Sequence, residues 1–503
     1  MATQPNILFL ITDQQRVDTL GCYGNPICRT LNVDGLAARG VRFDQAYTPT
    51  AICTPARASL ITGVLPFEHK LLANFERNVG YITELPADTD SFAYHLRDAG
   101  YNVGTVGKWH IGAARGPDAF GFDGLHYPGW GQPVQHPDYL RYLDEHGYPH
   151  FAVRDEIRGV FPNGQPGNVI AGIYTGPVEA GFPYFLAERT IQALERYAAQ
   201  DAPFFLACQW FGPHLPYYIP AAYADMYDPD TIPLPPAMAE TFAGKPTVQR
   251  HYAAHWTFDS FTPDQWRKLI AMYWGYVTLI DEQVGRILDA VTRLGLADAT
   301  ATFFTSDHGA FVGSHKMQDK GPAMYDDIYR VPLVAQLPGG RRHAAEERFV
   351  SLMDLPATFL DLAGAPVPDA YAGRSLAPLL RGDAVDDWRD HILAEFHGHH
   401  FPYPQRMIRT RSHKLVINPP DVNELYDLVN DPHELTNQID NPAYADVKRE
   451  LMRTLYADLK ARGDNFYHWM TSMFDVGEEV VDASLSEYGR ATRGTVDAAP
   501  NSA

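Results

Sequence analysis

The chain has 503 residues, of which 45% are hydrophobic and 20% are charged, and its formal net charge is −20. These proportions are typical of a soluble globular protein and exclude collagen-like, disordered and membrane-embedded classes. The negative charge argues against a nucleic-acid or anionic-membrane partner, because both require a basic face. It does not exclude an anionic substrate, since a metal ion with a few Lys or Arg side chains makes a pocket locally positive.

The cysteines and the first residues bear on the cellular compartment. Four cysteines are too few and too scattered for a disulfide framework in this chain, although Cys22 and Cys28 could pair. The opening MATQP leads directly into an apolar run, without the basic segment and long apolar core of a secretory signal. No apolar run is long enough to span a bilayer. We therefore expect a cytoplasmic protein.

Apolar runs of strand length alternate with amphipathic helical stretches. The runs are NILFLIT at 6–12, FFLAC at 204–208, TFFT at 302–305 and VPLVA at 331–335. Such continuous runs are typical of strands buried on both faces of a parallel sheet. With helices expected at 91–99 and 270–294, the pattern predicts an α/β fold, a doubly wound and mostly parallel sheet sandwiched by helices.

Two parts of the chain depart from this alternation. Residues 113–180 are rich in Gly, Pro and aromatic residues, so we expect a long irregular insertion that forms a pocket wall. From residue 391, short strand-like runs and a helix at 441–462 predict a smaller C-terminal α+β domain with a short antiparallel sheet. The predicted divisions are 1–388 for the catalytic domain, 389–480 for the smaller domain, and 481–503 for a polar tail, disordered or an oligomerisation arm.

Polar dipeptides follow two of the predicted strands. Asp13-Gln14 follows the first apolar run, and Asp307-His308 follows TFFTS. In a doubly wound sheet, ligands bind beyond the carboxyl ends of the strands. Taken singly, Asp13 would more often be a helix N-cap and His308 a surface loop residue. Their pairing at two strand ends instead favours a site for Ca²⁺, Mg²⁺ or Mn²⁺, which bind carboxylate oxygens.

The densest motif is TAICTPARASLITG at residues 50–63, which contains Cys53-Thr54-Pro55-Ala56-Arg57. A free cysteine is most often a buried structural residue, and an isolated CxPxR does not exclude that interpretation. Further motifs occur in order: PNILFLITD (5–13), TLNVDGL (30–36), VGKWHIG (106–112), FGPHLP (211–216), FTSDHG (304–309), KGPAMYDDIYRVP (320–332) and ELYDLVNDPHE (424–434). Together they closely resemble the formylglycine-dependent sulfatases of the alkaline phosphatase superfamily.

This resemblance implies a modified nucleophile. In that family the signature cysteine is oxidised to formylglycine by a dedicated generating enzyme, which would be a maturation partner acting on Cys53. The aldehyde hydrates to a geminal diol, and one hydroxyl attacks sulfur. The second hydroxyl lets the adduct collapse to aldehyde and free sulfate. An unmodified thiol could not complete this cycle.

The resemblance also implies one divalent metal ion. Its ligands would be Asp13, Gln14, Asp307, His308 and the oxygen of modified Cys53. Many family members have a second Asp in place of Gln14 and an Asn in place of His308. The loss of one anionic ligand and the gain of an imidazole favour Mn²⁺ over Ca²⁺. The same ligand set resembles bacterial phosphonate monoester hydrolases and their arylsulfatase relatives, so the metal and the substrate's charge stay open.

The remaining catalytic roles carry over by motif. Arg57 and Lys108 would hold the nucleophile, and Lys108 and Lys320 would bind the non-bridging oxygens of the transferred group. His110 is the expected base when the adduct collapses, and His214 is the expected acid or hydrogen-bond donor at the leaving oxygen.

Weaker signals come from other histidines and acids. The tract EFHGHH at 395–400 looks like a metal-binding tract but matches no ligand spacing of a first-row metal, and a simple loop is favoured over substrate contact. For His315, close to the metal loop, substrate contact is left open. The two aspartates in 325–330 indicate a helix face rather than a site.

The predicted function is hydrolysis of aryl or small organic sulfate monoesters. The aromatic residues of 113–180 weakly favour a small, flat or hydrophobic leaving group. The alternative is hydrolysis of phosphonate monoesters or phosphate diesters by the same nucleophile, because both reactions pass through loose anionic transition states. A non-catalytic anion- or metal-binding protein on this fold would show decay of the catalytic set, and none is visible. A metallophosphatase with a Ser or Thr nucleophile is disfavoured by Cys53. A homo-oligomer is possible.

Overall fold

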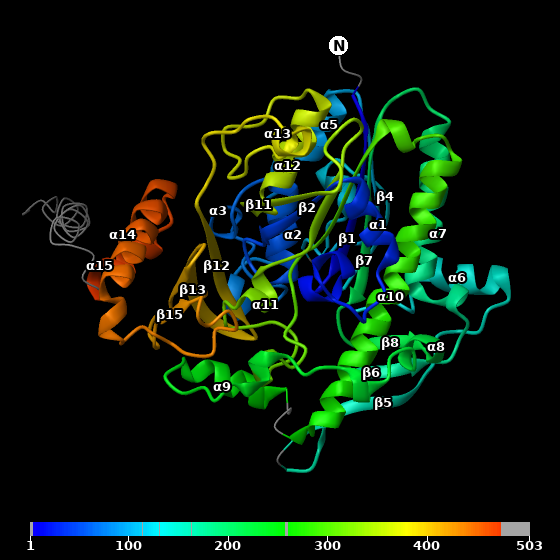
Figure 1. Cartoon of the computed structure of the whole chain (residues 1–503). Helices are drawn as coiled ribbons and strands as arrows, with labels where there is room; N and C mark the ends of the chain where they lie inside the picture. The colour runs from blue at the N-terminus through cyan, green and yellow to red at the C-terminus, as the bar shows by residue number, and fades with distance from the viewer. Residues whose placement is uncertain (1–3, 113, 130, 162, 257–259, 474–503) are drawn as a thin grey trace, which may run out of the picture.

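The computed structural model describes residues 4–112, 114–129, 131–161, 163–256 and 260–473. A large eight-stranded sheet has the order β11-β2-β10-β9-β1-β7-β3-β4 (Figure 1). Its strands are β1 (Asn6–Asp13), β2 (Val41–Tyr47), β3 (Asn102–Lys108), β4 (Asp123–Tyr127), β7 (Phe204–Pro213), β9 (Thr300–Ser306), β10 (Leu333–Gln336) and β11 (Ala344–Ser351). All neighbouring strands are parallel except β10, which is antiparallel to both β9 and β2. The mostly parallel sheet is therefore confirmed.

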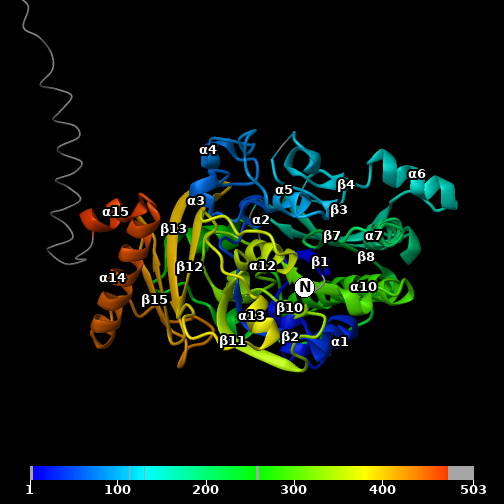
Figure 2. The ribbon, with the colours of Figure 1, turned by 90° about the horizontal axis from the view of Figure 1, so that it is seen from above.

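Helices cover both faces of this sheet (Figure 2). One face carries α1 (Leu31–Arg39), α7 (Phe182–Ala198) and α10 (Pro263–Arg293), and the other carries α2 (Cys53–Thr62), α5 (Phe92–Asp98) and α12 (Asp354–Ala363). Alternate residues of β1 serve the two layers: Leu8 and Leu10 join the first core, and Ile7, Phe9 and Ile11 join the second. This two-sided burial explains why the strand is a continuous apolar run.

The interpretation of 113–180 as an irregular insertion was wrong. The segment contains β4, the helix α6 (Pro137–His146), and the strands β5 (Val153–Val160) and β6 (Pro166–Tyr174). These two strands form a separate three-stranded sheet with β8 (Tyr217–Pro220), in the order β5-β6-β8. β5 is mostly solvent-exposed and its pairing with β6 shifts register repeatedly, so it lacks the apolar alternation that makes a strand visible in a sequence.

A small antiparallel sheet follows the large one, as predicted. Its strands are β12 (His391–His399), β13 (Phe401–Thr410), β14 (His413–Ile417) and β15 (Glu424–Asp427), and the helices α14 (Ala445–Arg462) and α15 (Phe466–Met473) follow it. Leu415 and Ile417 pack against α14, whereas Val416 joins the core of the large sheet. One face of the small sheet thus packs on the rest of the molecule. The division at 388/389 stays a prediction, and 481–503 lies outside the described residues.

The remaining short helices are α3 (Pro66–His69), α4 (Arg77–Gly80), α8 (Ala221–Ala224), α9 (Thr247–His255), α11 (Asp326–Tyr329) and α13 (Ala377–Arg381). All four cysteines are free thiols, so Cys22 and Cys28 do not pair here. None of the helices in the described ranges combines the length and the apolar composition needed to cross a membrane.

Candidate active site

Four adjacent parallel strands end at one edge of the large sheet. In the order β9-β1-β7-β3, Asp307 follows β9, Asp13 ends β1, His214 follows β7 and Lys108 ends β3. Because the carboxyl ends of parallel strands lie together, residues almost 300 positions apart in the chain meet here. Asp13, Lys108 and Asp307 have no exposed surface.

Cys53 is the first residue of α2, and all residues of that helix are buried. Its Sγ lies 3.1 Å from His308 Nε2 and 3.8 Å from Asp13 Oδ1. The amino end of a helix carries partial positive charge, which favours an anion at this position. Pro55 lies in the first turn, where a missing N–H breaks no helical hydrogen bond.

Arg57, one helical turn after Cys53, connects the two carboxylates. Its Nε donates to Asp307 Oδ2 at 2.9 Å, and its Nη2 donates to Asp13 Oδ2 at 3.2 Å. Its Nη1 donates to Gln209 Oε1 at 2.9 Å. Residues four apart lie on one face of a helix, so the CxPxR spacing presents the Cys53 side chain and the guanidinium to the same site.

The donor atoms fit a divalent cation. The ligand atoms of Asp13, Cys53, Asp307 and His308 all lie within 4.8 Å of one another. His308 Nδ1 donates to the Gly309 carbonyl at 2.8 Å, so in the neutral ring Nε2 presents its lone pair toward Cys53 and can bind a metal ion.

Gln14 supplies a further observation in favour of a cation. Its Nε2 donates to Asp319 Oδ1 at 3.0 Å, and its buried Oε1 has no hydrogen-bond partner in the described part of the chain. A buried oxygen without a partner is costly, and a cation removes that cost. The mixed carboxylate, amide and imidazole set suits a hard or borderline ion.

Two buried lysines supply positive charge. Lys108 Nζ donates to Asp13 Oδ2 at 2.6 Å. Lys320 Nζ lies 3.2 Å from Asp319 Oδ1 and donates to His214 Nε2 at 2.8 Å. Because His214 Nδ1 bonds to the Leu215 carbonyl at 2.6 Å, its Nε2 is the acceptor in the pair with Lys320. Burial lowers the pKa of Lys320, but Asp319 and other nearby anions outweigh that effect and raise it.

The charges around Cys53 alter its titration and that of His110. Burial raises the pKa of the Cys53 thiol, but Lys320 and Lys108 outweigh this effect and hold the pKa well below its usual range. Burial and Lys108 lower the pKa of His110 to about 4, so its imidazole is neutral near pH 7. Neither ring nitrogen of His110 has a hydrogen-bond partner among the described residues, so the ring is available to accept a proton.

A cavity of about 570 Å³ opens over Lys320 and His214. Its aromatic and polar lining side chains include Phe75, Tyr218, Trp256, Asn74, Glu76, Arg158, Asn168, His399 and His400, and Val169, Leu215 and Pro216 add apolar surface. Arg158 and Asn168 come from 113–180, so that segment does contribute a pocket wall. The cavity connects the buried charges with solvent and has room for a small organic ester.

Asp319 and Gln209 were not found in the sequence. Asp319 is buried in a left-handed conformation (φ 67°) and contacts both Gln14 and Lys320. Gln209 accepts from Arg57 and donates to Thr105 Oγ1 at 2.8 Å. An acid directly before the predicted Lys320 was the only available signal for Asp319, and Gln209 had none.

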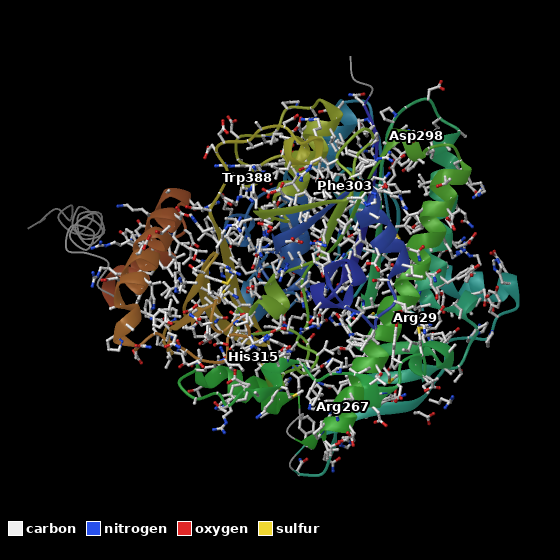
Figure 3. All side chains as sticks on the ribbon, viewed as in Figure 1. Arg29, Arg267, Asp298, Phe303, His315 and Trp388 are labelled. Carbon is white, nitrogen blue, oxygen red and sulfur yellow. The ribbon has the colours of Figure 1, made fainter. Side chains whose placement is uncertain are left out.

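The other histidine predictions separate clearly. His315, labelled in Figure 3, is fully buried, stacks on Tyr325 with ring centroids 3.6 Å apart, and bonds to Glu240, so it has a structural position. The interpretation of 397–400 as a simple loop was wrong, because β12 continues to His399. α11 carries the aspartates of 325–330, as expected for a helix.

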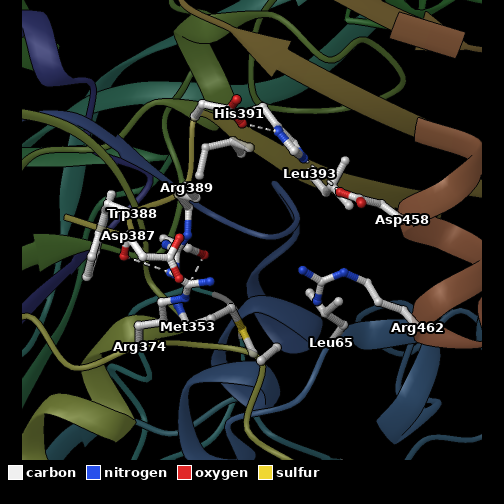
Figure 4. Close-up of a pocket in the computed structure, with 14 residues that line it drawn as sticks. Leu65, Met353, Arg374, Asp387, Trp388, Arg389, His391, Leu393, Asp458 and Arg462 are labelled. Atoms are coloured by element: carbon white, nitrogen blue, oxygen red, sulfur yellow. Dashed lines mark hydrogen bonds and ion pairs between the residues drawn. The ribbon is translucent and has the colours of Figure 1, made fainter. Parts of the chain in front are cut away.

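A second cavity, of about 460 Å³, lies where the first residues of β12 meet α14 (Figure 4). Arg389 pairs with both oxygens of Asp354, at 2.5 and 2.7 Å, and His391 Nε2 lies 2.7 Å from Asp458. None of the predicted site residues lines it. These ion pairs hold the small sheet and α14 against the rest of the molecule, so the second cavity is a structural contact region rather than a reaction site.

Known proteins share this architecture. The sulfatase family model matches residues 5–365, and the model of the N-sulphoglucosamine sulphohydrolase C-terminal region matches 313–461. The chain is 31% identical to the uncharacterized sulfatase YidJ of Escherichia coli, over 93% of this chain and 90% of that protein. It is 29% identical to an arylsulfatase of Clostridium perfringens, over 92% and 96% respectively. The crystal structure of a phosphonate monoester hydrolase from Agrobacterium radiobacter superposes with a TM-score of 0.75 at 28% identity, over 91% and 96%.

The fold and these matches define a hydrolase of the alkaline phosphatase superfamily, with helices on both faces of a mostly parallel sheet. More narrowly, the chain belongs to the sulfatase family and is a sulfuric ester hydrolase.

Proposed function

We propose that this protein hydrolyses aryl or small organic sulfate monoesters, with formylglycine derived from Cys53 as the nucleophile. The observation that carries the proposal is the position of Cys53 Sγ, 3.1 Å from His308 Nε2 at the amino end of α2. Arg57, Lys108 and Lys320 surround it with positive charge. A formylglycine-generating enzyme would be the maturation partner.

Lys108 and Lys320 would hold the sulfate oxygens while a hydroxyl of hydrated residue 53 attacks sulfur and the S–O bond to the leaving group breaks. His214, bonded to Lys320, lines the cavity together with that lysine, and the leaving oxygen would depart into this cavity. The pair would deliver a proton to this oxygen. His110 would then take the proton of the second hydroxyl, so that the aldehyde re-forms and sulfate is released.

Asp13, Gln14, Asp307 and His308 would hold one divalent ion, with Mn²⁺ favoured over Ca²⁺. When bound, such an ion supplies Lewis-acid stabilisation of negative charge at the nucleophile and the transferred group. Arg57 keeps both carboxylates oriented for that purpose through its two ion pairs.

A second candidate activity is hydrolysis of phosphonate monoesters or phosphate diesters by the same residues. It is supported by Gln14 and His308 in the ligand set and by the similarity to the Agrobacterium radiobacter hydrolase. A ranking of kcat/KM on an aryl sulfate, an aryl phosphonate monoester and an aryl phosphate would separate the two. Because two lysines and one metal offset limited charge, we expect the doubly charged aryl phosphate to be the poorest substrate.

The deciding experiment is the mass of the tryptic peptide 43–57 from protein co-expressed with the maturation enzyme, together with aryl sulfatase assays. We expect aldehyde in place of thiol, and Cys53→Ala should lose roughly four to six orders of magnitude in kcat. Cys22→Ala, a thiol outside the site, is the matched control and should keep full activity. An unmodified thiol in fully active protein would contradict the proposal.

A further inference from the structure

A second group of metal-binding side chains lies on the wall of the 570 Å³ cavity, separate from the donors around Cys53. One ligand atom each from Glu76, His399 and His400 lies within 4.8 Å of the others. Glu76 directly precedes α4, and His399 is the last residue of β12, so the cluster joins the segment before α4 to the small sheet. Glu76 Oε1 is 3.0 Å from His399 Nδ1.

The backbone places both imidazoles on one side. Successive side chains of a strand point to opposite faces, so neighbouring histidines would normally diverge. His400 has a left-handed conformation (φ 66°), which is uncommon outside glycine, and its ring centroid lies 3.9 Å from that of His399. The ring of His255, at the end of α9, is 5.3 Å from that of His400 and is a further nitrogen donor nearby.

The buried carboxylate of Asp319 contacts the ring nitrogen of His399 that does not face Glu76. His399 Nε2 lies 3.5 Å from Asp319 Oδ2, and Asp319 is only 3% exposed. Histidines that bind metals usually direct the second ring nitrogen to a carboxylate, which orients the ring and increases its basicity. His399 has this arrangement, with Nδ1 toward Glu76 and Nε2 toward Asp319.

We propose that Glu76, His399 and His400 form a second metal site, for a late first-row dication such as Zn²⁺. Two imidazoles and one carboxylate are the donor set that such ions prefer, whereas the site at Cys53 is richer in oxygen ligands. Three protein ligands leave a coordination position open, and all three of these residues line the substrate cavity.

The rearrangement required is small. Zinc–nitrogen bonds of about 2.1 Å in tetrahedral geometry separate ligand atoms by about 3.4 Å, so these side chains need to shift by about an ångström. The ion would replace the proton shared by His399 and Glu76, and Glu76 and Asp319 would offset its charge.

The test is Zn²⁺ anomalous diffraction from crystals of the wild-type chain soaked in Zn²⁺, with zinc content per chain measured in solution. We expect one peak among Glu76, His399 and His400, distinct from the peak at the Asp13–His308 site, and two zinc ions per chain. Glu76→Gln/His400→Ala should lose the first peak only. His251→Ala, in an adjoining cavity whose lining includes no acid, is the matched control and should keep both.

A single peak at the Asp13–His308 site in the wild-type chain would overturn the proposal, as would two zinc ions per chain in the Glu76→Gln/His400→Ala variant. The soaked wild-type crystal decides even if that variant does not fold. Because the readout is metal occupancy, its outcome is independent of sulfate ester hydrolysis, and Cys53→Ala should leave the proposed peak in place.

Discussion

Two buried ionic clusters in this protein differ in how their bonding capacity is used. One is the candidate active site around Asp13, Arg57 and Asp307. The other, which we call the Lys245 cluster, consists of Glu240, Lys245, His315, Tyr325 and Glu434. Lys245 Nζ donates to Glu240 Oε2 at 2.5 Å, to the Glu434 carbonyl at 2.6 Å and to Tyr325 Oη at 3.0 Å, which uses all three ammonium protons.

At the candidate active site, by contrast, Gln14 Oε1 and both ring nitrogens of His110 are buried without a hydrogen-bond partner in the described part of the chain. The Lys245 cluster also contains two such atoms, but each faces a charged partner: His315 Nε2 lies 3.6 Å from Asp327 Oδ2, and Glu434 Oε1 lies 2.6 Å from Lys414 Nζ. At the candidate active site, the pKa values of Cys53 and His110 are also lowered from their ordinary values. A saturated buried cation stabilises the fold, whereas unused donors and acceptors around one point indicate a place for a metal ion and a substrate.

The largest change in folding stability should follow from breaking the Lys245 cluster. Lys245→Met should lower the free energy of unfolding by about 3–5 kcal/mol, because it removes one member of a buried charge pair. The kcat of the folded fraction should stay at the wild-type value. Urea unfolding and initial rates measure these two quantities. Arg267→Ala, which removes a surface pair with Asp264, is the control and should cost no more than about 1 kcal/mol.

The reverse pattern is expected at Lys320. Lys320→Ala should lower kcat/KM for an aryl sulfate by roughly 10²–10³, because the substitution removes a preorganised ammonium group that stabilises the negative charge of the transferred group. Steady-state kinetics and circular dichroism would test this. Lys316→Ala, an exposed lysine four residues earlier, should be silent. A wild-type rate for Lys320→Ala would remove this residue from the active site.

A smaller change is expected at Asp319, which connects Gln14 to Lys320. Asp319→Asn should weaken binding of the divalent ion by roughly 10- to 100-fold, because the partner that orients the Gln14 amide loses its charge. The measurement is activity as a function of metal concentration after chelation. An unchanged metal requirement would show that Asp319 does not position Gln14.

The smallest effect is a pH dependence of stability in the Lys245 cluster. Burial opposes ionisation of Glu240, but its hydrogen bond from His315 and the charge of Lys245 hold its pKa at about 2, below the ordinary 4.5. A lowered pKa in the folded state stabilises above pH 4.5, and this contribution is lost as pH falls toward 2. Urea midpoints between these pH values should fall less steeply for Glu240→Gln than for the wild type, and equal slopes would contradict the assignment.

Features carried by short stretches of chain could be predicted from the sequence. Runs of apolar residues predicted β1, β7 and β9, since a strand covered on both faces needs apolar side chains throughout. The CxPxR motif and the dipeptides after two strands identified Cys53, Arg57, Asp13 and Asp307, because helix periodicity and strand direction determine where such residues lie.

Only the tertiary structure decided the features that depend on distant contacts. Asp319 became a partner of Gln14 and His399 because the chain folds back across the sheet edge, and nothing near it in the sequence indicates those contacts. His315 became structural because it is buried against Glu240. The exposed strand β5 could not be predicted from the sequence, because it is stabilised by pairing with β6 and has no alternation of apolar and polar residues. Local sequence thus indicated Cys53 as the candidate nucleophile and determined the main strands, and packing between distant segments decided which buried polar groups are saturated and which keep unused bonding capacity.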